Sequence, residues 1–247
     1  MDIKELKSGV NPDTHWYYQS KKVPLLAFFE DLVKAQGKPL TVIDFGAGSG
    51  FFTYELYRAF PQHIAQALLI DIEYTDEELA ETKDAAIQKL RYIPEGINDA
   101  VVIMMDVLEH IENDLAVLED IKQRTGQNIH YFITVPAFMS VWSSHDVYLG
   151  HFRRYTLPTL TSLLNNAKSK IDSKYYIFGS IFPLVWLLRR IKRSNTENME
   201  EPTSSDMKPI PGPINSLLKA YNTMEMGFRK WNSWFGLTCV AEGVLKD

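Results

Sequence analysis

A short apolar run that ends in a glycine-rich turn constrains the fold of this chain more than any other feature of its sequence. Residues 40–45 read LTVIDF, and residues 46–50 read GAGSG. An apolar run of this length, closed by glycines, predicts a buried strand. Residues 51–60, which Pro61 follows, predict a helix directly after the turn. We therefore expect a strand–turn–helix unit of the kind from which α/β sheets are built.

Further strands and helices alternate along the chain. Strands are expected at 66–71, near 90–93, and at 100–105, 129–134, 174–178 and 237–245. Helices are expected at 24–36, where Pro24 suits a first turn, at 75–89 after a capping box, at 113–124 after Asn113 or Asp114, and from Thr156 onward. Residues 135–155 are expected to form a long loop. The alternation predicts a mostly parallel sheet with helices on both faces.

The bulk composition excludes some classes of protein. The length of 247 residues fits one α/β domain with elaborations. A net charge of -5 argues against a nucleic-acid-binding protein, which usually has a basic face. The one cysteine, Cys239, and an N-terminus without an apolar signal region favour a reducing, cytoplasmic location.

The most apolar stretch, residues 177–188 (IFGSIFPLVWLL), is too short to span a bilayer and is followed by four basic residues within 189–193. It predicts either a helix that lies on a membrane surface or a buried helix, and the buried helix is the favoured interpretation. Residues 195–213 are rich in proline and polar residues and predict a flexible loop.

The glycine turn also indicates a ligand. A dinucleotide site has its third glycine one position later, where this chain has Phe51. A pyrophosphate avoids a carboxylate such as Asp44, whereas a cationic ligand such as S-adenosylmethionine, with its ammonium and sulfonium, suits one. Asp71 ends the next expected strand, 21 residues after Gly50, where a carboxylate can accept both hydroxyls of a ribose.

Four segments carry a family resemblance that runs from about residue 15 to the end. VIDFGAGSG (42–50) resembles the first motif of class I S-adenosylmethionine-dependent methyltransferases, and VVIMMDVLEHIEND (101–114) resembles their fourth-strand motif, in the branch with Leu108-Glu109-His110. TVPAFMSVWSSHDVYLGHFRRYT (134–156) and GLTCVAEG (236–243) resemble a bacterial subgroup often encoded near glycosyltransferase and envelope-lipid genes.

The resemblance implies a Rossmann-like, doubly wound, seven-stranded sheet that is mostly parallel, with an antiparallel last strand. We expect a single domain over 1–247, with an N-terminal helical segment at 1–37 and a small helical insertion, or cap, at 179–232. The cap, formed by the apolar run and the loop after it, is hypothesised to cover an apolar acceptor.

The resemblance also implies the cofactor-binding residues. Asp44 and the turn are expected to hold the methionine part, and Asp71 and Ile72 the ribose and adenine. The segment 15–18 (HWYY) resembles one that closes over the cofactor, but a surface helix with an aromatic side in the core explains it equally well. An acidic residue that often follows the third strand has no clear match. The expected set is Asp44, Gly46, Ala47, Gly48, Ser49, Gly50, Asp71, Ile72, Met105, Asp106, Val107, Tyr17 and Lys21.

The acceptor side is expected in the loop at 135–155, which follows the fifth strand. His145 or His151 is a candidate general base, and His110 is a third candidate for which a structural role is favoured. Hydrogen bonding within the loop is the alternative role for every residue there. No His/Cys cluster has metal-ligand spacing, so metal-independent catalysis is expected. The candidate substrate residues are Trp142, Asp146, Arg153, Arg154 and Tyr155.

These observations predict an S-adenosylmethionine-dependent methyltransferase that acts on the oxygen or nitrogen of a small-molecule, saccharide-linked or lipid-linked acceptor. Peripheral membrane contact through 177–193 is a further expectation. One alternative is a partner subunit that binds the cofactor without catalysis. A nicotinamide-dependent oxidoreductase is disfavoured by Phe51 and Asp44.

Overall fold

The computed structural model describes residues 9–81, 86–194 and 209–246. A seven-stranded sheet with the order β3-β2-β1-β4-β5-β7-β6 forms its centre. Strands β1 to β5 pair in parallel, and β7 runs antiparallel to both β5 and β6, so the expected sheet is confirmed. The strands are β1 (Leu40–Phe45), β2 (Ile64–Ile70), β3 (Ile87–Leu90), β4 (Ala100–Met105), β5 (Ile129–Pro136), β6 (Lys170–Ile177) and β7 (Thr238–Lys246).

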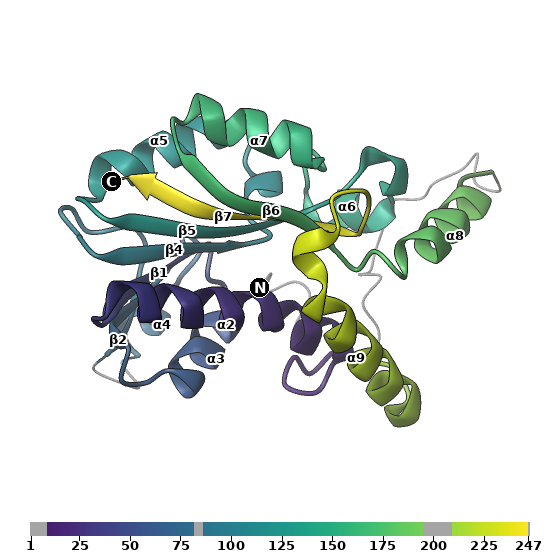
Figure 1. Ribbon diagram of the computed structural model, residues 1–247, viewed down its shortest axis with the longest axis horizontal. Helices are drawn as coiled ribbons and strands as arrows, with labels where there is room; N and C mark the ends of the chain where they lie inside the picture. The colour runs from purple at the N-terminus through teal and green to yellow at the C-terminus, as the bar shows by residue number, and fades with distance from the viewer. Residues whose placement is uncertain (1–8, 82–85, 195–208, 247) are drawn as a thin grey trace.

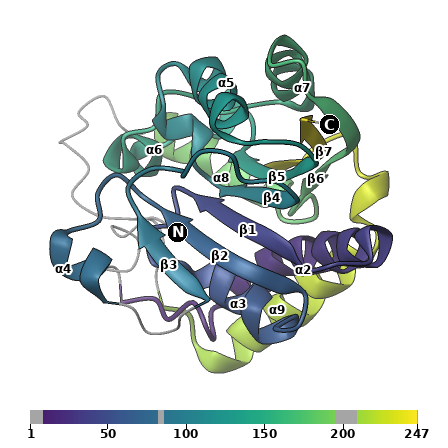
Figure 2. The ribbon, with the colours of Figure 1, turned by 90° about the vertical axis from the view of Figure 1, so that its left-hand side faces the viewer.

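Helices cover both faces of the sheet (Figures 1 and 2). Successive residues of a strand point to opposite faces. Val42 accordingly packs in the core under α2 and α3, and Ile43 in the core under α5 and α7. The helices are α2 (Trp16–Gln36), α3 (Phe51–Ala59), α4 (Asp76–Ala80), α5 (Asp114–Arg124), α6 (Ser144–Leu149), α7 (Leu157–Asn166), α8 (Phe182–Ser194) and α9 (Gly212–Gly227), with short 3-10 turns η1 (Leu108–His110), η2 (Met139–Val141) and η3 (Arg229–Trp231).

Helix α2 begins eight residues earlier than expected, because a distant residue supplies its N-terminus with a partner. The backbone N–H of Trp16 donates to Oδ1 of Asn215, on α9, at 2.9 Å. The side-chain amide of Asn215 donates in turn to the carbonyl of Thr14 at 2.8 Å. Pro24 therefore lies inside the helix, and the prediction that it occupies the first turn was wrong.

Two further expectations about elements were wrong. Residues 87–89 form part of β3 and not of a helix, because they pair with β2 at the edge of the sheet. The helix that Thr75 caps ends at Ala80, although the capping box itself is confirmed. The loop expected at 135–155 contains η2 and α6, and β5 extends to Pro136, where it pairs with Thr238 of β7.

The interpretation of the apolar run as a buried helix was also wrong. Helix α8 projects from the body of the molecule at the right of Figure 1. Its leucines Leu184, Leu187 and Leu188 are 60%, 50% and 52% exposed. Within the described part of the chain, no helix has both the length and the apolar character needed to cross a bilayer.

Candidate active site

The glycine turn packs directly on Val107, the second residue after β4. The backbone N–H groups of Gly46 and Ala47 donate to the carbonyl of Ile70 at 2.8 and 3.1 Å. Gly46 has a φ of 71°, and a Cβ added to it would lie 2.7 Å from Cγ2 of Val107. Glycine is therefore required here by both the backbone conformation and the space. The carboxyl ends of β1, β2 and β4 meet at this turn.

Two acids flank the turn, as the sequence predicts. Asp44 is buried and accepts a hydrogen bond from the hydroxyl of Thr53 at 2.7 Å. Burial raises the pKa of the Asp44 carboxyl to about 6. Asp71 accepts from the backbone N–H groups of Gly48 at 2.9 Å and Glu73 at 3.0 Å. Asp44 thus lies just before the turn in the chain, and Asp71 accepts a hydrogen bond from within it.

Two other side chains at the turn bear on ligand binding. Ile72, directly after Asp71, is 73% exposed. The buried hydroxyl of Ser49 has no hydrogen-bond partner among the described residues. A buried hydroxyl without a partner costs free energy, so a ligand that supplies one is favoured here.

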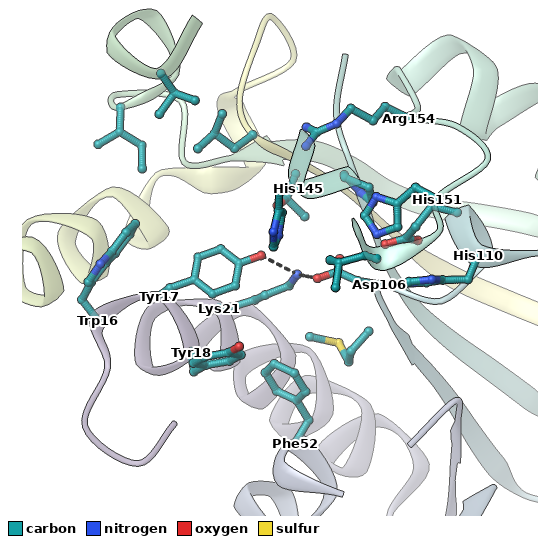
Figure 3. A pocket seen from close by; sticks show the side chains of 18 of the residues that line it. Trp16, Tyr17, Tyr18, Lys21, Phe52, Asp106, His110, His145, His151 and Arg154 are labelled. Carbon is teal, nitrogen blue, oxygen red and sulfur yellow. Dashed lines mark hydrogen bonds and ion pairs between the residues drawn. The ribbon is translucent and has the colours of Figure 1, made fainter. Parts of the chain in front are cut away.

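A cavity of about 230 Å³ opens at the carboxyl end of β4 (Figure 3). We call it the β4 cavity. Its walls come from segments far apart in the sequence: the start of α2, the end of β4, η1, α6 and α8. The polar or aromatic lining includes Trp16, Tyr17, Tyr18, Lys21, Phe52, Asp106, Glu109, His110, His145, His151, Arg154 and Arg189.

A buried ion pair joins α2 to β4 at the floor of this cavity. The Lys21 ammonium pairs with the Asp106 carboxylate and donates to the hydroxyl of Tyr17 at 3.1 Å. The hydroxyl of Thr134 donates to the same carboxylate at 3.0 Å. Although burial opposes both charges, the pKa of Asp106 is lowered and that of Lys21 is raised, because each charge stabilises the other. Tyr17 and Lys21 were expected to bind the cofactor; both line the β4 cavity, and Lys21 already pairs with an anion of the protein itself.

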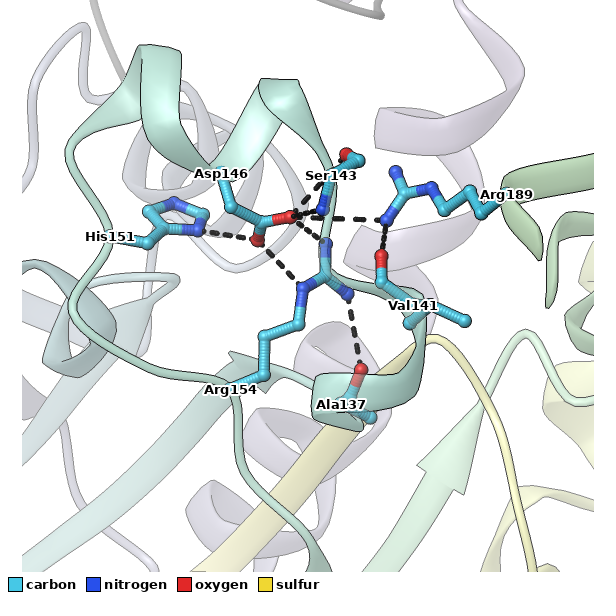
Figure 4. A network of polar contacts seen from close by, with 7 residues as sticks. All are labelled: Ala137, Val141, Ser143, Asp146, His151, Arg154 and Arg189. Carbon is cyan, nitrogen blue, oxygen red and sulfur yellow. Dashed lines mark hydrogen bonds and ion pairs between the residues drawn. The ribbon is translucent and has the colours of Figure 1, made fainter. Parts of the chain in front are cut away.

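A second buried network fixes α6 and the residues after it (Figure 4). Asp146 has no exposed surface and receives two bonds from the Arg154 guanidinium, at 2.7 and 3.1 Å. His151 Nδ1 lies 2.9 Å from the same carboxylate, and the N–H of Ser143 donates to it at 2.8 Å. Burial alone would raise the pKa of Asp146, but the bond from His151 and the charge of Arg154 hold it below its usual range.

This network divides the candidate substrate residues into two groups. Arg154 lines the β4 cavity, whereas Asp146 lies behind it and anchors Arg154 and His151. Arg153 points away and pairs with Asp114 at 2.8 Å. The hydroxyl of Tyr155 donates to Asp114 at 2.6 Å. Trp142 is half-buried and is not part of the cavity wall.

The three candidate histidines are brought together. His145, His151 and His110 all line the β4 cavity, and the rings of His110 and His151 have centroids 4.5 Å apart and lie nearly perpendicular, at 87°. Sequence reasoning did not single out Glu109 or Arg189. Glu109 stands beside His110 in the fourth-strand motif, which is a signal that was available, whereas Arg189 reaches the cavity only because one side of α8 lies next to it.

Comparison with known proteins identifies the class. A family model described as a methyltransferase domain matches residues 16–173. A solved S-adenosylmethionine-dependent methyltransferase from Archaeoglobus fulgidus is similar over 97% of this chain and 97% of that one, with 12% identity and a TM-score of 0.54. One from Mesorhizobium loti is similar over 95% of this chain and 100% of that one, with 12% identity and a TM-score of 0.51. No curated protein matches the chain.

Proposed function

The chain belongs to the methyltransferase domain family, and from that premise we propose that it methylates an acceptor bound in the β4 cavity. Its cofactor is S-adenosylmethionine. The observation that carries the proposal is the position of residues 105–107. Val107 packs on the glycine turn, while Met105 and Asp106 line the cavity, so three consecutive residues join the two sites.

The side chains around the turn fit this cofactor. Asp44 offers a carboxylate to the ammonium group. The unpartnered hydroxyl of Ser49 offers a further polar contact. The oxygens of Asp71 retain lone pairs for ribose hydroxyls, and exposed Ile72 offers an apolar surface to adenine. When bound, the cofactor supplies a methyl group that its sulfonium has already activated.

His145 is the base that we propose for a hydroxyl acceptor. It lies in the cavity wall across from the Lys21–Asp106 pair (Figure 3). The next residue, Asp146, is fully buried and fixed by Arg154, so α6 is anchored immediately beside it. The imidazole takes the proton that the acceptor hydroxyl loses, and the surrounding aromatic rings exclude water.

The acceptor that we propose is lipid-linked, because the cavity opens beside an exposed apolar surface. Ile181, directly before α8, and Val185 of α8 line the cavity, and the other side of α8 faces solvent. Helix α9, η3 and the residues directly after η3 expose further apolar side chains. We call these exposed side chains together the α8–η3 patch; it comprises Leu184, Leu187, Leu188, Ile191, Leu217, Tyr221, Met224, Phe228, Trp231 and Trp234, each at least 46% exposed.

An anionic bilayer surface is the partner that this composition favours. Trp231 and Trp234 are 83% and 79% exposed, and tryptophan is enriched where proteins meet the headgroup region of membranes. Besides Arg189, which faces the cavity, the sequence of α8 contains Arg190, Lys192 and Arg193, and basic residues attract anionic headgroups. We propose that the expected cap, residues 179–232, comprises α8, α9 and η3; residues 195–208 of it lie outside the described residues.

Isothermal titration with S-adenosylmethionine, with NAD as the control ligand, tests the cofactor site. We expect binding of the first and none of the second. The absence of binding to S-adenosylmethionine would refute the proposal.

Transfer of a tritiated methyl group into a bacterial lipid extract tests the acceptor class. Incorporation that His145→Ala abolishes, without loss of cofactor binding, supports it. Binding of the cofactor without transfer to lipid or water-soluble extracts would favour a non-catalytic partner subunit.

Co-sedimentation with vesicles tests the membrane contact. Wild type should sediment with vesicles that contain phosphatidylglycerol and less with pure phosphatidylcholine, and Trp231→Ser with Trp234→Ser should reduce this. Tyr92, which is 67% exposed beside β3 at the opposite edge of the sheet, provides the matched control as Tyr92→Ser. Equal sedimentation of all variants would exclude the patch as the contact surface.

A further inference from the structure

A cluster of three metal-binding side chains lies in the wall of the β4 cavity. Glu109 and His110 belong to η1, and His151 follows α6. Each offers one ligand atom, and these atoms all lie within 4.8 Å of one another. The residues are adjacent only in the folded chain, because η1 and the end of α6 approach each other beyond the ends of β4 and β5.

Glu109 occupies an environment that a lone carboxylate does not favour. Its side chain is fully buried, and neither carboxylate oxygen has a hydrogen-bond partner among the described residues. The two cations that approach it, Lys21 and Arg154, are already paired with Asp106 and Asp146. A buried carboxylate in this situation is stabilised by a further positive charge.

His151 is oriented to supply a lone pair to the same place. Its Nδ1 faces the buried carboxylate of Asp146 at 2.9 Å, which keeps the proton on that nitrogen. Its Nε2 is buried and has no hydrogen-bond partner among the described residues. A histidine whose far nitrogen donates to a carboxylate is the usual arrangement of a metal ligand, because the carboxylate fixes the ring and raises its basicity.

We propose that Glu109, His110 and His151 bind one divalent cation of the Zn²⁺ type. One carboxylate and two imidazoles form a donor set that such ions accept, with at least one coordination position left for another ligand. Nitrogen and oxygen ligands around zinc stand about 3.3 Å apart, so the cluster closes by a side-chain movement on the order of 1 Å. The role of the cation rests on the proposed function. The three ligands line the β4 cavity, so a bound cation would hold the acceptor hydroxyl there and lower its pKa, and His145 would take the proton.

This site departs from the metal-independent catalysis that the sequence spacing predicts. Glu109 and His151 are 42 positions apart, and no common metal-binding motif has this spacing. The fold, and not the local sequence, provides the cluster.

Metal binding by the tag-free chain, stripped with a chelator, tests the proposal directly. Titration with Zn²⁺ should give one site per chain, and Co²⁺ should give the visible absorption of a coordinated ion. Glu109→Gln and His151→Ala should each weaken binding at least tenfold. His63→Ala, which removes an exposed histidine before β2, is the matched control and should leave binding unchanged. Failure of wild type to bind stoichiometrically, or full binding by Glu109→Gln and His151→Ala, would overturn the site.

A stability measurement separates a lost ligand from a damaged fold. Without metal, Glu109→Gln should unfold at the same urea concentration as wild type or a higher one, because it removes an unpaired buried carboxylate. Zn²⁺ should raise the melting temperature of wild type and not that of Glu109→Gln. An equal rise in both would contradict the proposal. Titration of metal-free protein with S-adenosylmethionine tests the cofactor site separately, so failure of one assignment is distinguishable from failure of the other.

Discussion

The Asp44 carboxyl allows a quantitative test of the cofactor site. It lies at the end of β1, 3% exposed, and burial raises its pKa from the ordinary 3.8 to about 6. If this carboxylate binds the ammonium of S-adenosylmethionine, the ionised form carries the affinity. With a pKa of about 6, the carboxyl is about nine-tenths ionised at pH 7 and about one-tenth at pH 5. The dissociation constant should therefore rise about tenfold between pH 7 and pH 5, which is about 1.4 kcal/mol.

Isothermal titration at pH 5, 6 and 7, at constant ionic strength, measures this change. Asp44→Asn removes the charge but retains the size of the side chain. Its affinity should be at least tenfold weaker than that of wild type at pH 7, and it should not change between pH 5 and pH 7. A wild-type affinity that stays flat over this range, or an Asn variant that keeps the tenfold slope, would refute the assignment.

The pH dependence of the stability of the unliganded chain has the opposite sign to that of the cofactor affinity. Because the pKa of Asp44 is higher in the folded state than in the unfolded state, the folded state binds the proton more tightly. The free energy of unfolding should therefore fall by ~3 kcal/mol as the pH rises from about 3 to about 7, with about 2 kcal/mol of this between pH 4 and pH 6. Urea unfolding of Asp44→Asn should lack this contribution, which verifies the pKa independently of any ligand.

Three further predictions concern the scaffold. Gly46→Ala should lower the free energy of unfolding by about 2–4 kcal/mol, because the new Cβ meets Val107 at 2.7 Å in a backbone conformation with a φ of 71°; Val107→Ala in the same chain should restore part of the loss, and no recovery would contradict the clash. Arg154→Met should lower the free energy of unfolding in urea at pH 7 by about 3–5 kcal/mol, because it leaves the buried Asp146 carboxylate without its main cation. A loss below about 1 kcal/mol would show that His151 alone stabilises this carboxylate. Leu184→Ser with Leu188→Ser should change the unfolding free energy by less than about 0.5 kcal/mol each, since both side chains are at least half exposed; a large loss would mean that α8 is packed in solution.

The elements that depend on neighbouring residues alone were predicted correctly. Strands β1 and β4 have the expected bounds, and the side chains of Thr75 and Asn113 cap their helices. Hydrophobic runs and caps act within a few residues, so the sequence contains the information they need. The start of α2 was missed because its partner, Asn215, lies 199 positions away from Trp16.

The candidate site likewise combines features that neighbouring residues determine with contacts that depend on remote ones. Adjacent arginines differ completely in their surroundings: Arg154 faces the cavity and binds Asp146, and Arg153 binds Asp114 on the other side. Sequence motifs identify the segment, but they do not distinguish its two arginines. The exposure of α8 was missed for a related reason, since an apolar run has the same pattern whether it covers a core or faces solvent.

The sequence by itself determined the glycine turn, the acid before it and the strands that carry them. These depend on backbone conformations that glycine permits and on apolar runs that must be buried. Only the tertiary structure decided which ionisable side chains share the cavity. Lys21 meets Asp106, and Glu109 meets His151, because the ends of β4 and β5 and the start of α2 converge at one edge of the sheet. Charge and coordination chemistry depend on distances of a few ångströms, and chain positions do not specify distances between remote residues.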